Sequence, residues 1–525
     1  MAGWREEHLQ KGGVCGGTVP KVNSEHKDAG KRKSFAQKKA ICRSIEGARQ
    51  EEMKARLQVM KFGGTSVGDA SCIARAVEII AQAAKQNGCI AVVSAMSGVT
   101  NRLIEAAKKA QTGDSGEAAA VVDALRQQHE AALTSLIQHQ EERVRIRQRM
   151  EEVLAEGRRL CEGTALLREL TPRTLDAISS LGERLSAPLV AAAVRERGLP
   201  SEAIEATELI VTDAFHGGAE PHMELTRKKS QARLRPLLEK GIAPVVTGFI
   251  GATLEGQLTT LGRGGSDYSA TILGAAMDAD EVIIWTDVDG VLTADPRLVE
   301  EARTIPVISY REAAELAYFG ARVLHPKTLN PVVQAAIPVW IRNSFACERP
   351  GTKITPEGRS IGGGVKALTA IRDVTLISVG GPGIVGLPDV LGRTFSTTAE
   401  VRANVLLISQ SSSQNDICFI VSTVDAQRTV EALRKEFAQD LAHHKVEHIT
   451  VDSSVAIVAV VGENMRGTPG IAGRTFNALG REKVNLIAIA QGSSECNISF
   501  VIDEKAVKTA LNTAHREFGL EASPN

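Results

Sequence analysis

The sequence predicts an α/β domain, with a sheet flanked by helices, followed by two smaller α+β modules. Two patterns support this prediction: short β-branched runs alternate with longer helical stretches from residue 57 onward, and the end of the chain repeats itself. The length of 525 residues is also more than one hydrophobic core normally holds. We therefore expect several domains in one chain.

The composition is that of a globular protein, with 43% hydrophobic and 24% charged residues. The 62 basic residues balance the 62 acidic ones, so net charge does not attract the chain to nucleic acid or to an anionic membrane. The eight cysteines form no C-x-x-C pair, which favours reduced thiols in the cytoplasm over disulfides or a structural metal site. No apolar run approaches the roughly 20 residues that span a bilayer.

Residues 1–56 are expected to form a disordered basic tail. The first 57 residues hold 13 basic and 7 acidic residues and show no apolar period. Neither a secretory signal nor an organellar transit peptide is predicted, because the tail lacks an apolar segment and contains acidic residues. A start codon assigned too far upstream would give the same pattern.

Beyond this tail, hydrophobic patterns locate the elements of the first domain. A charged stretch between about residues 121 and 170 carries an apolar stripe that includes Ile146 and Leu154, which predicts a helical hairpin. A segment rich in glycine and proline, residues 349–365, predicts a domain boundary. The expected strands are residues 90–94, 244–249, 282–286 and 339–342.

The end of the chain contains a duplication. With an offset of 81 residues, 11 of the 30 positions from Gly392 to Val421 are identical, against about two expected by chance. Two copies of this length predict a duplicated small domain and not a solenoid, which needs at least three repeats. Each copy is expected to contain a strand, a glycine-rich loop, a helix and two further strands.

Residues 61–66 read KFGGTS and lie between an apolar run and a predicted helix. A strand, a glycine turn and a helix start bring backbone N–H groups to one point, here beside Lys61, and such a point holds phosphate well. The lysine precedes the glycines, so this is not the Walker pattern. Gly-Gly pairs also open many ordinary helices, and the motif alone leaves both interpretations open.

A second glycine cluster, GRGGSD at residues 262–267, again separates a predicted strand from a helix expected to begin near Tyr268. Ser266 and Asp267 are candidate helix caps, and Arg263 offers a planar fork for carboxylate or phosphate. If both glycine loops lie at one sheet edge, a nucleotide can bind across the carboxyl ends of the strands.

Two further stretches carry polar groups near predicted strand or helix ends. In WTDVDGVLTADPR, residues 285–297, Asp287 and Asp295 indicate either a nucleoside contact or a solvated acidic loop, because the glutamate of a calcium-binding EF-hand is missing. In LGERLS, Glu183 lies in an apolar helical stretch and would bind an ammonium group or form a salt bridge. His325 stands alone before a proline and is interpreted as structural.

Six motifs in order, KFGGTS, SAMSGVTN, LGERLS, TTLGRGGSDYSA, WTDVDGVLTADPR and YFGARVLHPKT, resemble the aspartate kinases of the amino-acid kinase family. The duplicated ending, with QSSS and QGSS, is similar to the paired ACT modules of these enzymes. The likeness covers about residues 57–520 and looks closest to the kinase portion of fused aspartate kinase and homoserine dehydrogenase enzymes, with no G-x-G-x-x-G dinucleotide-binding module after the ACT pair. It implies an amino-acid kinase domain at residues 57–350, a linker at 351–370, and ferredoxin-like ACT modules at 371–450 and 451–525.

The resemblance implies ATP-dependent transfer of a phosphoryl group to the β-carboxylate of L-aspartate, giving 4-phospho-L-aspartate for lysine, threonine and methionine synthesis. Lys61 would neutralise the phosphoryl group in transit, Asp267 would orient the lysine, and Arg263 would bind a substrate carboxylate. Glu183 would take the substrate's ammonium, and Mg²⁺ is expected to accompany ATP. The other implied aspartate contacts are Ser94, Thr100, Gly264, Gly265 and Ser266. The implied ATP contacts are Lys61, Phe62, Gly63, Gly64, Thr286, Asp287, Val291, Asp295, Arg297 and Arg322.

One of these positions departs from the family. Arg322 stands where the family commonly has lysine. The two cations differ in shape and hydration, so the geometry of a nucleotide contact changes.

For control, the resemblance implies that an end-product amino acid binds the ACT pair and shifts the enzyme between states of different activity. Threonine is the first expected effector and lysine the second, and ACT pairing across chains implies a homodimer or larger assembly. The alternatives are another kinase of the same fold and a non-catalytic amino-acid sensor, against which the retention of Lys61, Arg263 and Asp267 argues. The candidate effector residues are Gln410, Gln491, Asn404 and Asn485.

Overall fold

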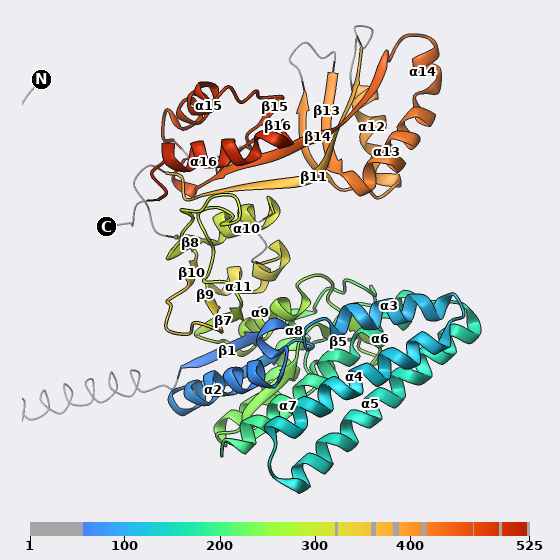
Figure 1. Cartoon of the computed structure of the whole chain (residues 1–525), viewed down its shortest axis with the longest axis vertical. Coiled ribbons are helices and arrows are strands. Elements are labelled where there is room, and N and C mark those ends of the chain that lie inside the picture. The colour runs from blue at the N-terminus through green and yellow to red at the C-terminus, as the bar shows by residue number, and fades with distance from the viewer. Residues whose placement is uncertain are drawn as a thin grey trace, which may run out of the picture. The chain divides into compact units, whose positions relative to one another are not determined.

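The structure is a computed structural model that describes residues 56–320, 324–358, 364–381, 388–410, 416–465, 467–492 and 496–521 (Figure 1). Residues 1–55 of the predicted basic tail and the predicted nucleotide contact Arg322 lie outside these ranges. Within them, no helix combines the length and the apolar character needed to cross a lipid bilayer.

An eight-stranded sheet forms the centre of the first domain, as the alternation of β-branched runs predicts. Its strands are β1 (Leu57–Phe62), β2 (Gly88–Val93), β3 (Ser201–Ile204), β4 (Ala243–Thr247), β7 (Glu281–Thr286), β8 (Val307–Ser309), β9 (Val339–Asn343) and β10 (Thr352–Thr355). Their order is β3-β4-β2-β1-β7-β9-β10-β8, and every neighbouring pair is parallel except β9 and β10. A separate hairpin consists of β5 (Ile250–Ala252) and β6 (Leu258–Thr260).

Helices cover both faces of this sheet (Figure 1). They are α2 (Ala70–Gln86), α3 (Val99–Gln111), α4 (Ser115–Leu136), α5 (Gln140–Leu167), α6 (Pro172–Ser179), α7 (Leu181–Glu196), α8 (Met223–Glu239), α9 (Gly265–Met277), α10 (Tyr310–Tyr318) and α11 (Asn330–Ala335), with the 3-10 helices η1 (Thr65–Val67), η2 (Ala206–Glu208) and η3 (Pro326–Leu329). Val59 and Ile284 pack in one hydrophobic cluster with α8 and α9. Met60 and Ile283 pack in another with α2 and α7. Neighbouring strand residues point to opposite faces, so strands covered on both faces are apolar throughout.

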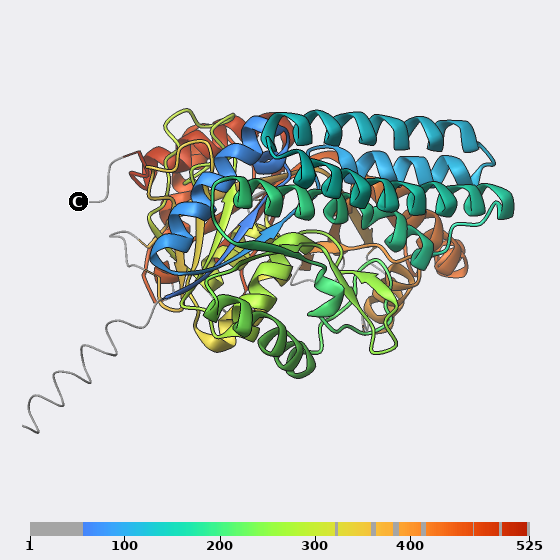
Figure 2. The ribbon, with the colours of Figure 1, turned by 90° about the horizontal axis from the view of Figure 1, so that it is seen from below.

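The strands predicted at residues 90–94, 244–249, 282–286 and 339–342 are present as β2, β4, β7 and β9. β4 ends at Thr247, two residues before its predicted end, and the chain turns at Phe249, whose φ is 71°. The predicted helical hairpin is also present, as α4 and α5 (Figure 2). Its apolar stripe, including Ile146 and Leu154, is buried against the rest of the domain.

The carboxyl ends of β1, β2, β4 and β7 lie at the same edge of the sheet, because these strands are parallel neighbours. The KFGGTS segment follows β1, and Ser94 follows β2. Thr286 ends β7. Ligands of open α/β sheets bind at this edge, so the fold gathers the predicted motifs where a small-molecule site is expected.

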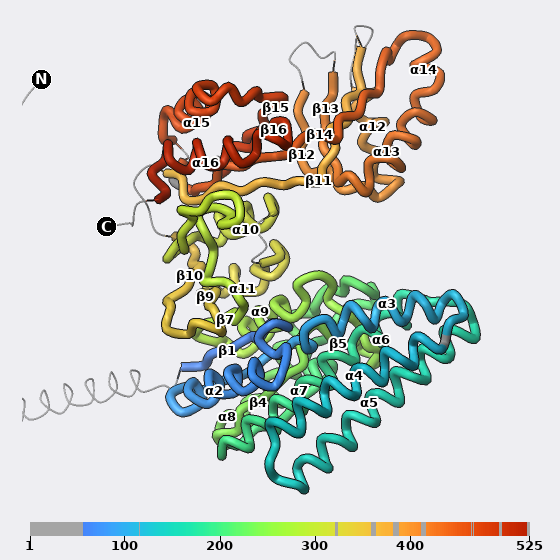
Figure 3. The backbone as a smooth tube through the Cα atoms, viewed as in Figure 1, coloured from blue at the N-terminus to red at the C-terminus, as the bar shows by residue number. Residues whose placement is uncertain are grey.

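The end of the chain forms a six-stranded antiparallel sheet with helices, as predicted for α+β modules (Figure 3). The strands are β11 (Ala367–Gly380), β12 (Val405–Gln410), β13 (Asp416–Ser422), β14 (His448–Val461), β15 (Ala488–Ala490) and β16 (Asn497–Asp503). The helices are α12 (Pro388–Glu400), α13 (Thr423–Glu436), α14 (Ala438–Ala442), α15 (Ile471–Arg481) and α16 (Val507–Glu517), with η4 (Glu463–Met465) and η5 (Glu504–Ala506). The strand order is β12-β13-β11-β14-β16-β15.

The duplication extends to side-chain packing. Phe395 meets Phe419 edge-on at a centroid distance of 5.6 Å, and the equivalent Phe476 meets Phe500 at 5.8 Å. In each module a helix, α13 or α16, follows the last strand of the repeat, and the sequence prediction did not include these helices. Both helices begin after the 30 repeated positions.

Two long strands run through the predicted domain boundaries. β11 crosses the boundary between the predicted linker and the first module, and β14 crosses the boundary between the two modules. β10, which also lies in the segment predicted as a linker, pairs with β8 and β9 of the first sheet. β11 pairs with β14 from Ala367 to Gly380, so the two modules share their central strand pair.

Candidate active site

A cavity of about 760 Å³ opens at the carboxyl edge of the first sheet. It brings together all of the predicted catalytic and substrate-binding residues, although they come from four separate segments of the chain. The predicted residues that line it are Lys61, Gly63, Gly64, Ser94, Thr100, Glu183, Arg263, Gly264, Gly265, Ser266, Asp267 and Thr286. This convergence makes the cavity the candidate active site.

Lys61 and Asp267 form an ion pair at the centre of this lining. Lys61 is the penultimate residue of β1, and its Nζ lies 2.5 Å from Oδ1 of Asp267 in the first turn of α9. Both side chains are largely buried, with exposed fractions of 11% and 15%. A Cβ on Gly63 would lie only 3.3 Å from the lysine Nζ, so the glycine keeps space open beside the ammonium group.

The GRGGSD segment forms the amino terminus of α9. The helix begins at Gly265, with Gly264 as its N-cap in the left-handed region at φ 68° and no side-chain cap. The prediction that Ser266 and Asp267 cap this helix is therefore wrong; both lie in its first turn. A Cβ on Gly264 would lie 2.9 Å from Cβ of His325, so a larger residue cannot fit here. The uncapped amino terminus directs N–H groups and a partial positive charge at the cavity, which suits an anionic ligand.

Glu183 is the least satisfied charged group of the site. It lies in the first turn of α7, is 3% exposed, and its Oε2 has no hydrogen-bond partner among the described residues. Burial raises the pKa of this carboxyl to about 8, although the N–H of Ala95 and the charge of Lys61 oppose the shift. A buried carboxylate of this kind favours a cationic partner, so it suits a ligand with an ammonium group.

Asp176 is a functional candidate that the sequence prediction missed. It lines the same cavity from α6 and is nearly fully buried. Its carboxylate accepts hydrogen bonds from the N–H and hydroxyl of Thr260 at 3.2 and 2.5 Å and from the N–H of Gly217 at 3.1 Å, and it contacts His216 Nδ1 at 2.8 Å. Asp176 therefore anchors β6 just before the loop that carries Arg263. Asp176 lies on α6 and Glu183 on the next helix, α7, so helical periodicity in the sequence could not link them.

Phe249 is a second residue that the sequence prediction missed. It lines the cavity, and its φ of 71° is unusual for a bulky residue. Its N–H donates to the Ser269 hydroxyl at 2.9 Å, and its carbonyl accepts the N–H of Leu261 at 2.9 Å. A Cβ on Gly265 would lie 2.6 Å from the Phe249 ring, so this ring and α9 depend on each other for their positions.

The residues predicted to contact ATP divide into four groups: residues that line the cavity, the buried Phe62, residues of the loop after β7, and Arg322. Phe62 points away from the cavity, is fully buried and stacks on Trp285 at a centroid distance of 6.4 Å. Thr286 lines the cavity, and Arg322 lies outside the described residues. Asp287, Val291, Asp295 and Arg297 belong to the loop after β7 and are not part of the described cavity lining.

This loop is internally bonded. Asp295 accepts hydrogen bonds from the Arg297 N–H at 2.9 Å and from its Nε at 3.0 Å. Val291 is buried and bonds through its N–H to the Thr352 hydroxyl at 2.8 Å. Among the residues that the structure describes, no group of three or more His, Cys, Asp or Glu is arranged to hold a metal ion.

The predicted effector residues lie on the two edge strands of the second sheet. Asn404 directly precedes β12, and Gln410 is its last residue. Asn485 and Gln491 lie on either side of β15, and all four residues are exposed. The two edge strands approach each other where the Ser409 hydroxyl donates to the carbonyl of Ile489 at 3.5 Å. The duplicated segments therefore bring their equivalent polar residues toward one region.

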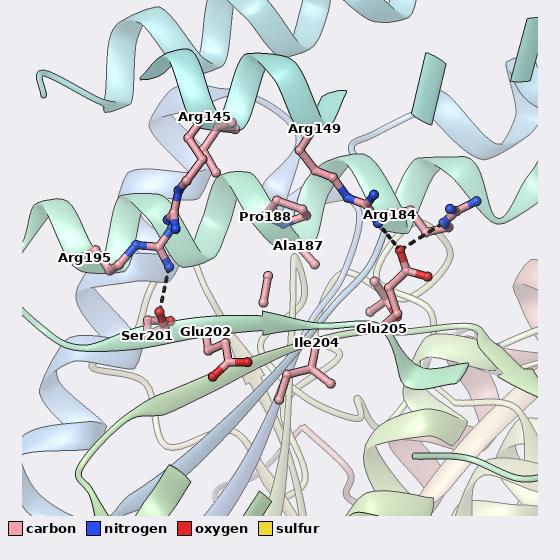
Figure 4. A pocket seen from close by; sticks show the side chains of 13 residues that line it. Arg145, Arg149, Arg184, Ala187, Pro188, Arg195, Ser201, Glu202, Ile204 and Glu205 are labelled. Carbon is pink, nitrogen blue, oxygen red and sulfur yellow. Dashed lines mark hydrogen bonds and ion pairs between the residues drawn. The ribbon is translucent and has the colours of Figure 1, made fainter. Parts of the chain in front are cut away.

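A second cavity, of about 400 Å³, lies between α5, α7 and β3 (Figure 4). Four arginines line it, and each is matched by a glutamate. Arg149 and Arg184 converge on Glu205 at 2.7 and 3.2 Å, and Arg195 and Arg145 both pair with Glu142. Arg149 also pairs with Glu152 and Arg184 with Glu156, so four glutamates neutralise the four arginines, and we do not assign an anion to this cavity.

The comparisons with known proteins agree with this fold. Residues 56–343 match the Amino acid kinase family, and residues 377–437 and 458–518 match the ACT domain. The chain therefore belongs to the amino acid kinase family and carries a pair of ACT domains, as the sequence motifs predict.

Within this family, the relatives are aspartokinases. The chain is 30% identical to aspartokinase 1, chloroplastic, of Arabidopsis thaliana, over 91% of this chain and 82% of that protein. It is 35% identical to the bifunctional aspartokinase/homoserine dehydrogenase, chloroplastic, of Daucus carota, over 89% of this chain and 51% of that protein. The chain thus spans about half the length of the bifunctional relatives it matches.

Solved structures give the same result. E. coli aspartokinase III in complex with aspartate and ADP is similar with a TM-score of 0.74 and 31% identity, over 88% of this chain and 99% of that one. The same enzyme in complex with lysine and aspartate is similar with a TM-score of 0.73 and 31% identity, over 88% of this chain and 99% of that one. The predicted fold class, a kinase domain followed by ACT domains, is confirmed.

Proposed function

We propose that the chain is an ATP-dependent aspartate kinase that converts L-aspartate to 4-phospho-L-aspartate. The observation that carries this proposal is the pairing of Lys61 with Asp267 in one cavity with the buried, unmatched carboxyl of Glu183. The aspartate and ADP bound to the similar E. coli enzyme support the same substrates.

The cavity offers a complementary group to each charge of L-aspartate. Glu183 would accept the ammonium group, because a positive charge beside the buried carboxyl favours its ionised form. Arg263 has an exposed side chain on the lining and would bind a carboxylate with its planar fork. Ser94 and Thr100 line the same cavity and would donate further hydrogen bonds.

Phosphoryl transfer then needs positioning and charge neutralisation. An oxygen of the β-carboxylate would attack the γ-phosphorus, the bond to the β–γ bridging oxygen would break, and ADP would leave with that oxygen. The carboxylate is already a nucleophile, so no protein base is required. Lys61, the N–H groups at the start of α9, and Gly63 and Gly64 would surround the γ-phosphoryl group.

ATP is expected to enter as its Mg²⁺ complex, with the metal neutralising part of the phosphate charge. On the nucleoside side we propose contacts from Thr286 and Asp287 at the end of β7. The loop residues Val291, Asp295 and Arg297 follow along the chain. Arg322 is proposed as a further contact from the sequence alone.

Regulation is proposed to act through the ACT pair, with threonine as the first candidate effector and lysine as the second. The lysine complex of the similar E. coli enzyme supports an amino-acid effector. Homodimerisation or higher assembly through these modules is proposed, since Ile408 and Ile489 expose 49% and 45% of their surface on the edge strands. We place the enzyme in the cytoplasm, at the first step of lysine, threonine and methionine synthesis.

The direct test measures ATP-dependent acyl-phosphate formation, trapped as the hydroxamate, from L-aspartate and separately from L-glutamate. We expect turnover with aspartate and not with glutamate, and suppression by threonine or by lysine. Turnover with glutamate alone would assign the chain to another kinase of this fold. Tight binding of ATP and aspartate without turnover would favour the amino-acid sensor.

A further inference from the structure

The loop between β7 and β8 has two different faces. One part of it carries Asp295 and Arg297, which we propose as nucleotide contacts, and the Arg297 side chain is 72% exposed. Another part is buried against the second ACT module, through α16. The loop thus joins the proposed ATP site to a helix more than 200 residues later in the chain.

Backbone hydrogen bonds give this loop a defined shape. The N–H of Thr293 donates to the carbonyl of Arg303 at 2.8 Å, and the N–H of Ile305 donates to the carbonyl of Val291 at 2.8 Å. Leu292 and Thr304 form an antiparallel bridge. The segment from Val291 to Ile305 is therefore a short hairpin.

Two side chains of α16 hold this hairpin. His515, which is 1% exposed, lies with its Nε2 3.0 Å from the hydroxyl oxygen of Thr293. Asn512 donates from Nδ2 to the carbonyl of Leu298 at 2.9 Å. The two contacts are made one helical turn apart on α16 and five residues apart on the loop, so they fix both its position and its direction.

The Thr293 contact uses both hydrogen-bonding capacities of the hydroxyl. The oxygen accepts the N–H of Arg303 at 3.0 Å, which leaves its hydrogen free to donate to Nε2 of His515. Burial is the largest influence on the ring and lowers the pKa of His515, so a neutral imidazole with an accepting Nε2 is assigned. A neutral hydrogen bond in a buried place has strict geometric demands.

Hydrophobic packing joins the same two elements. Ala294 and Val299 of the loop are buried in one cluster with Leu511 and Ala514 of α16. Val299 is fully buried although it belongs to a connecting loop. Loops normally run over the surface, so this burial indicates that the position of the loop depends on α16.

From these contacts we propose that His515 and Asn512 are positioning residues for the nucleotide: they hold residues 291–303 in the conformation that receives ATP. The second ACT module is then a structural part of the ATP site. The proposal rests on the proposed function, because that function places the nucleotide at this loop. Aspartate binding depends on Glu183 and Arg263 in the cavity, which this loop does not line in the described structure.

The test compares His515→Gln, Asn512→Ala and Thr293→Val with the full-length wild-type chain. Each variant removes one or two neutral hydrogen bonds, so we expect KM for ATP and Kd for ADP to rise about three- to tenfold. KM for aspartate should stay within about twofold. The double variant Thr293→Val/His515→Gln should weaken ADP binding no more than the stronger single variant, because both single changes remove the same contact.

Lys508→Ala is the matched control, since this exposed residue lies on the same helix, one turn before Asn512. It should leave both KM values unchanged. Equal rises in the two KM values, or a lower melting temperature with unchanged ADP binding, would overturn the proposal and assign His515 and Asn512 a purely structural role. Calorimetry of ADP binding separates failure of this proposal from failure of the proposed function. A wild-type chain that binds ADP without phosphorylating aspartate would contradict the function. The effect of the three variants on ADP binding would still test whether His515 and Asn512 position the loop.

Discussion

The two cavities of the first domain both contain charged side chains, and they differ in how those charges are matched. In the arginine-lined cavity, Arg149 and Arg184 share Glu205 (Figure 4), and Arg195 pairs with Glu142. In the cavity at the strand ends, one oxygen of buried Glu183 has no partner among the described residues, and the start of α9 has no side-chain cap.

This difference separates charged groups that pair with each other within the fold from groups that are available to bind a ligand. Ion pairs that satisfy each other stabilise a local arrangement and leave little capacity for binding. A buried carboxyl with an unpartnered oxygen is costly in the free protein, and a ligand of complementary charge recovers that cost. Arginine content alone would have pointed to the wrong cavity.

The largest effect is expected from Lys61→Ala. Removing the ammonium group next to Asp267 removes charge stabilisation of the transferred phosphoryl group and leaves Asp267 without its cation. Turnover should fall at least about 100-fold with the fold intact, which hydroxamate formation and circular dichroism measure. Lys108→Ala, an exposed lysine on α3, serves as the control. Near-normal turnover of the Lys61 variant would remove the lysine from the mechanism.

The next effect is expected from Glu183→Gln, which keeps the shape of the side chain and removes its charge. Hydrogen bonds to charged groups contribute about 1.5–3 kcal/mol, so KM for aspartate should rise about 10- to 100-fold. KM for ATP should change much less. Glu196→Gln at the other end of α7, where the carboxylate pairs with His139, should alter neither value. Equal changes for both substrates would contradict an ammonium site at Glu183.

A smaller effect concerns stability and pH. Because the pKa of Glu183 is raised from 4.5 to about 8, the folded chain keeps a proton that the unfolded chain has lost. The contribution of Glu183 to the free energy of unfolding should therefore fall as pH rises from about 4.5 to about 8. Urea denaturation measures this effect. As pH rises across this range, the free energy of unfolding of Glu183→Gln should increase relative to that of the wild type. A difference independent of pH would contradict the raised pKa.

The smallest effect on activity is expected from Arg195→Gln in the arginine-lined cavity. The change removes hydrogen bonds to Glu142 and to the carbonyl of Ser201. Stability should fall by about 1–3 kcal/mol, since the bonds involve charged groups. Both KM values should stay within about twofold, as steady-state kinetics can determine. A selective rise in one KM would mean that this cavity also serves a substrate.

The sequence predicted the fold and most of the cavity lining because the relevant signals are local. A glycine pair after a β-branched run requires a strand followed by a tight turn, wherever the segment lies in the fold. Parallel strands then bring such turns to one edge. The duplication was equally visible, since equivalent residues such as Phe395 and Phe476 repeat at a fixed spacing and pack in the same way.

The residues that sequence reasoning missed owe their roles to tertiary contacts. Asp176 is important because Thr260 and Gly217, far along the chain, direct donors at it. Phe249 has an unusual backbone conformation, and its ring lies against Gly265 of α9, a contact between segments that local sequence patterns do not show. The prediction that Ser266 and Asp267 cap α9 was wrong because the helix already begins at Gly265, with Gly264 as its N-cap.

The long shared strands of the ACT pair have a consequence for dissecting this protein. β11 pairs with β14 over its full length, and each of these two strands runs through both modules. The two modules therefore depend on the same central strand pair. A chain cut at residue 450 would lose most of β14 and expose the backbone of β11 as a new sheet edge, which is prone to aggregate. The two modules should accordingly exchange their amide hydrogens in one cooperative opening, and neither is suited to separate expression.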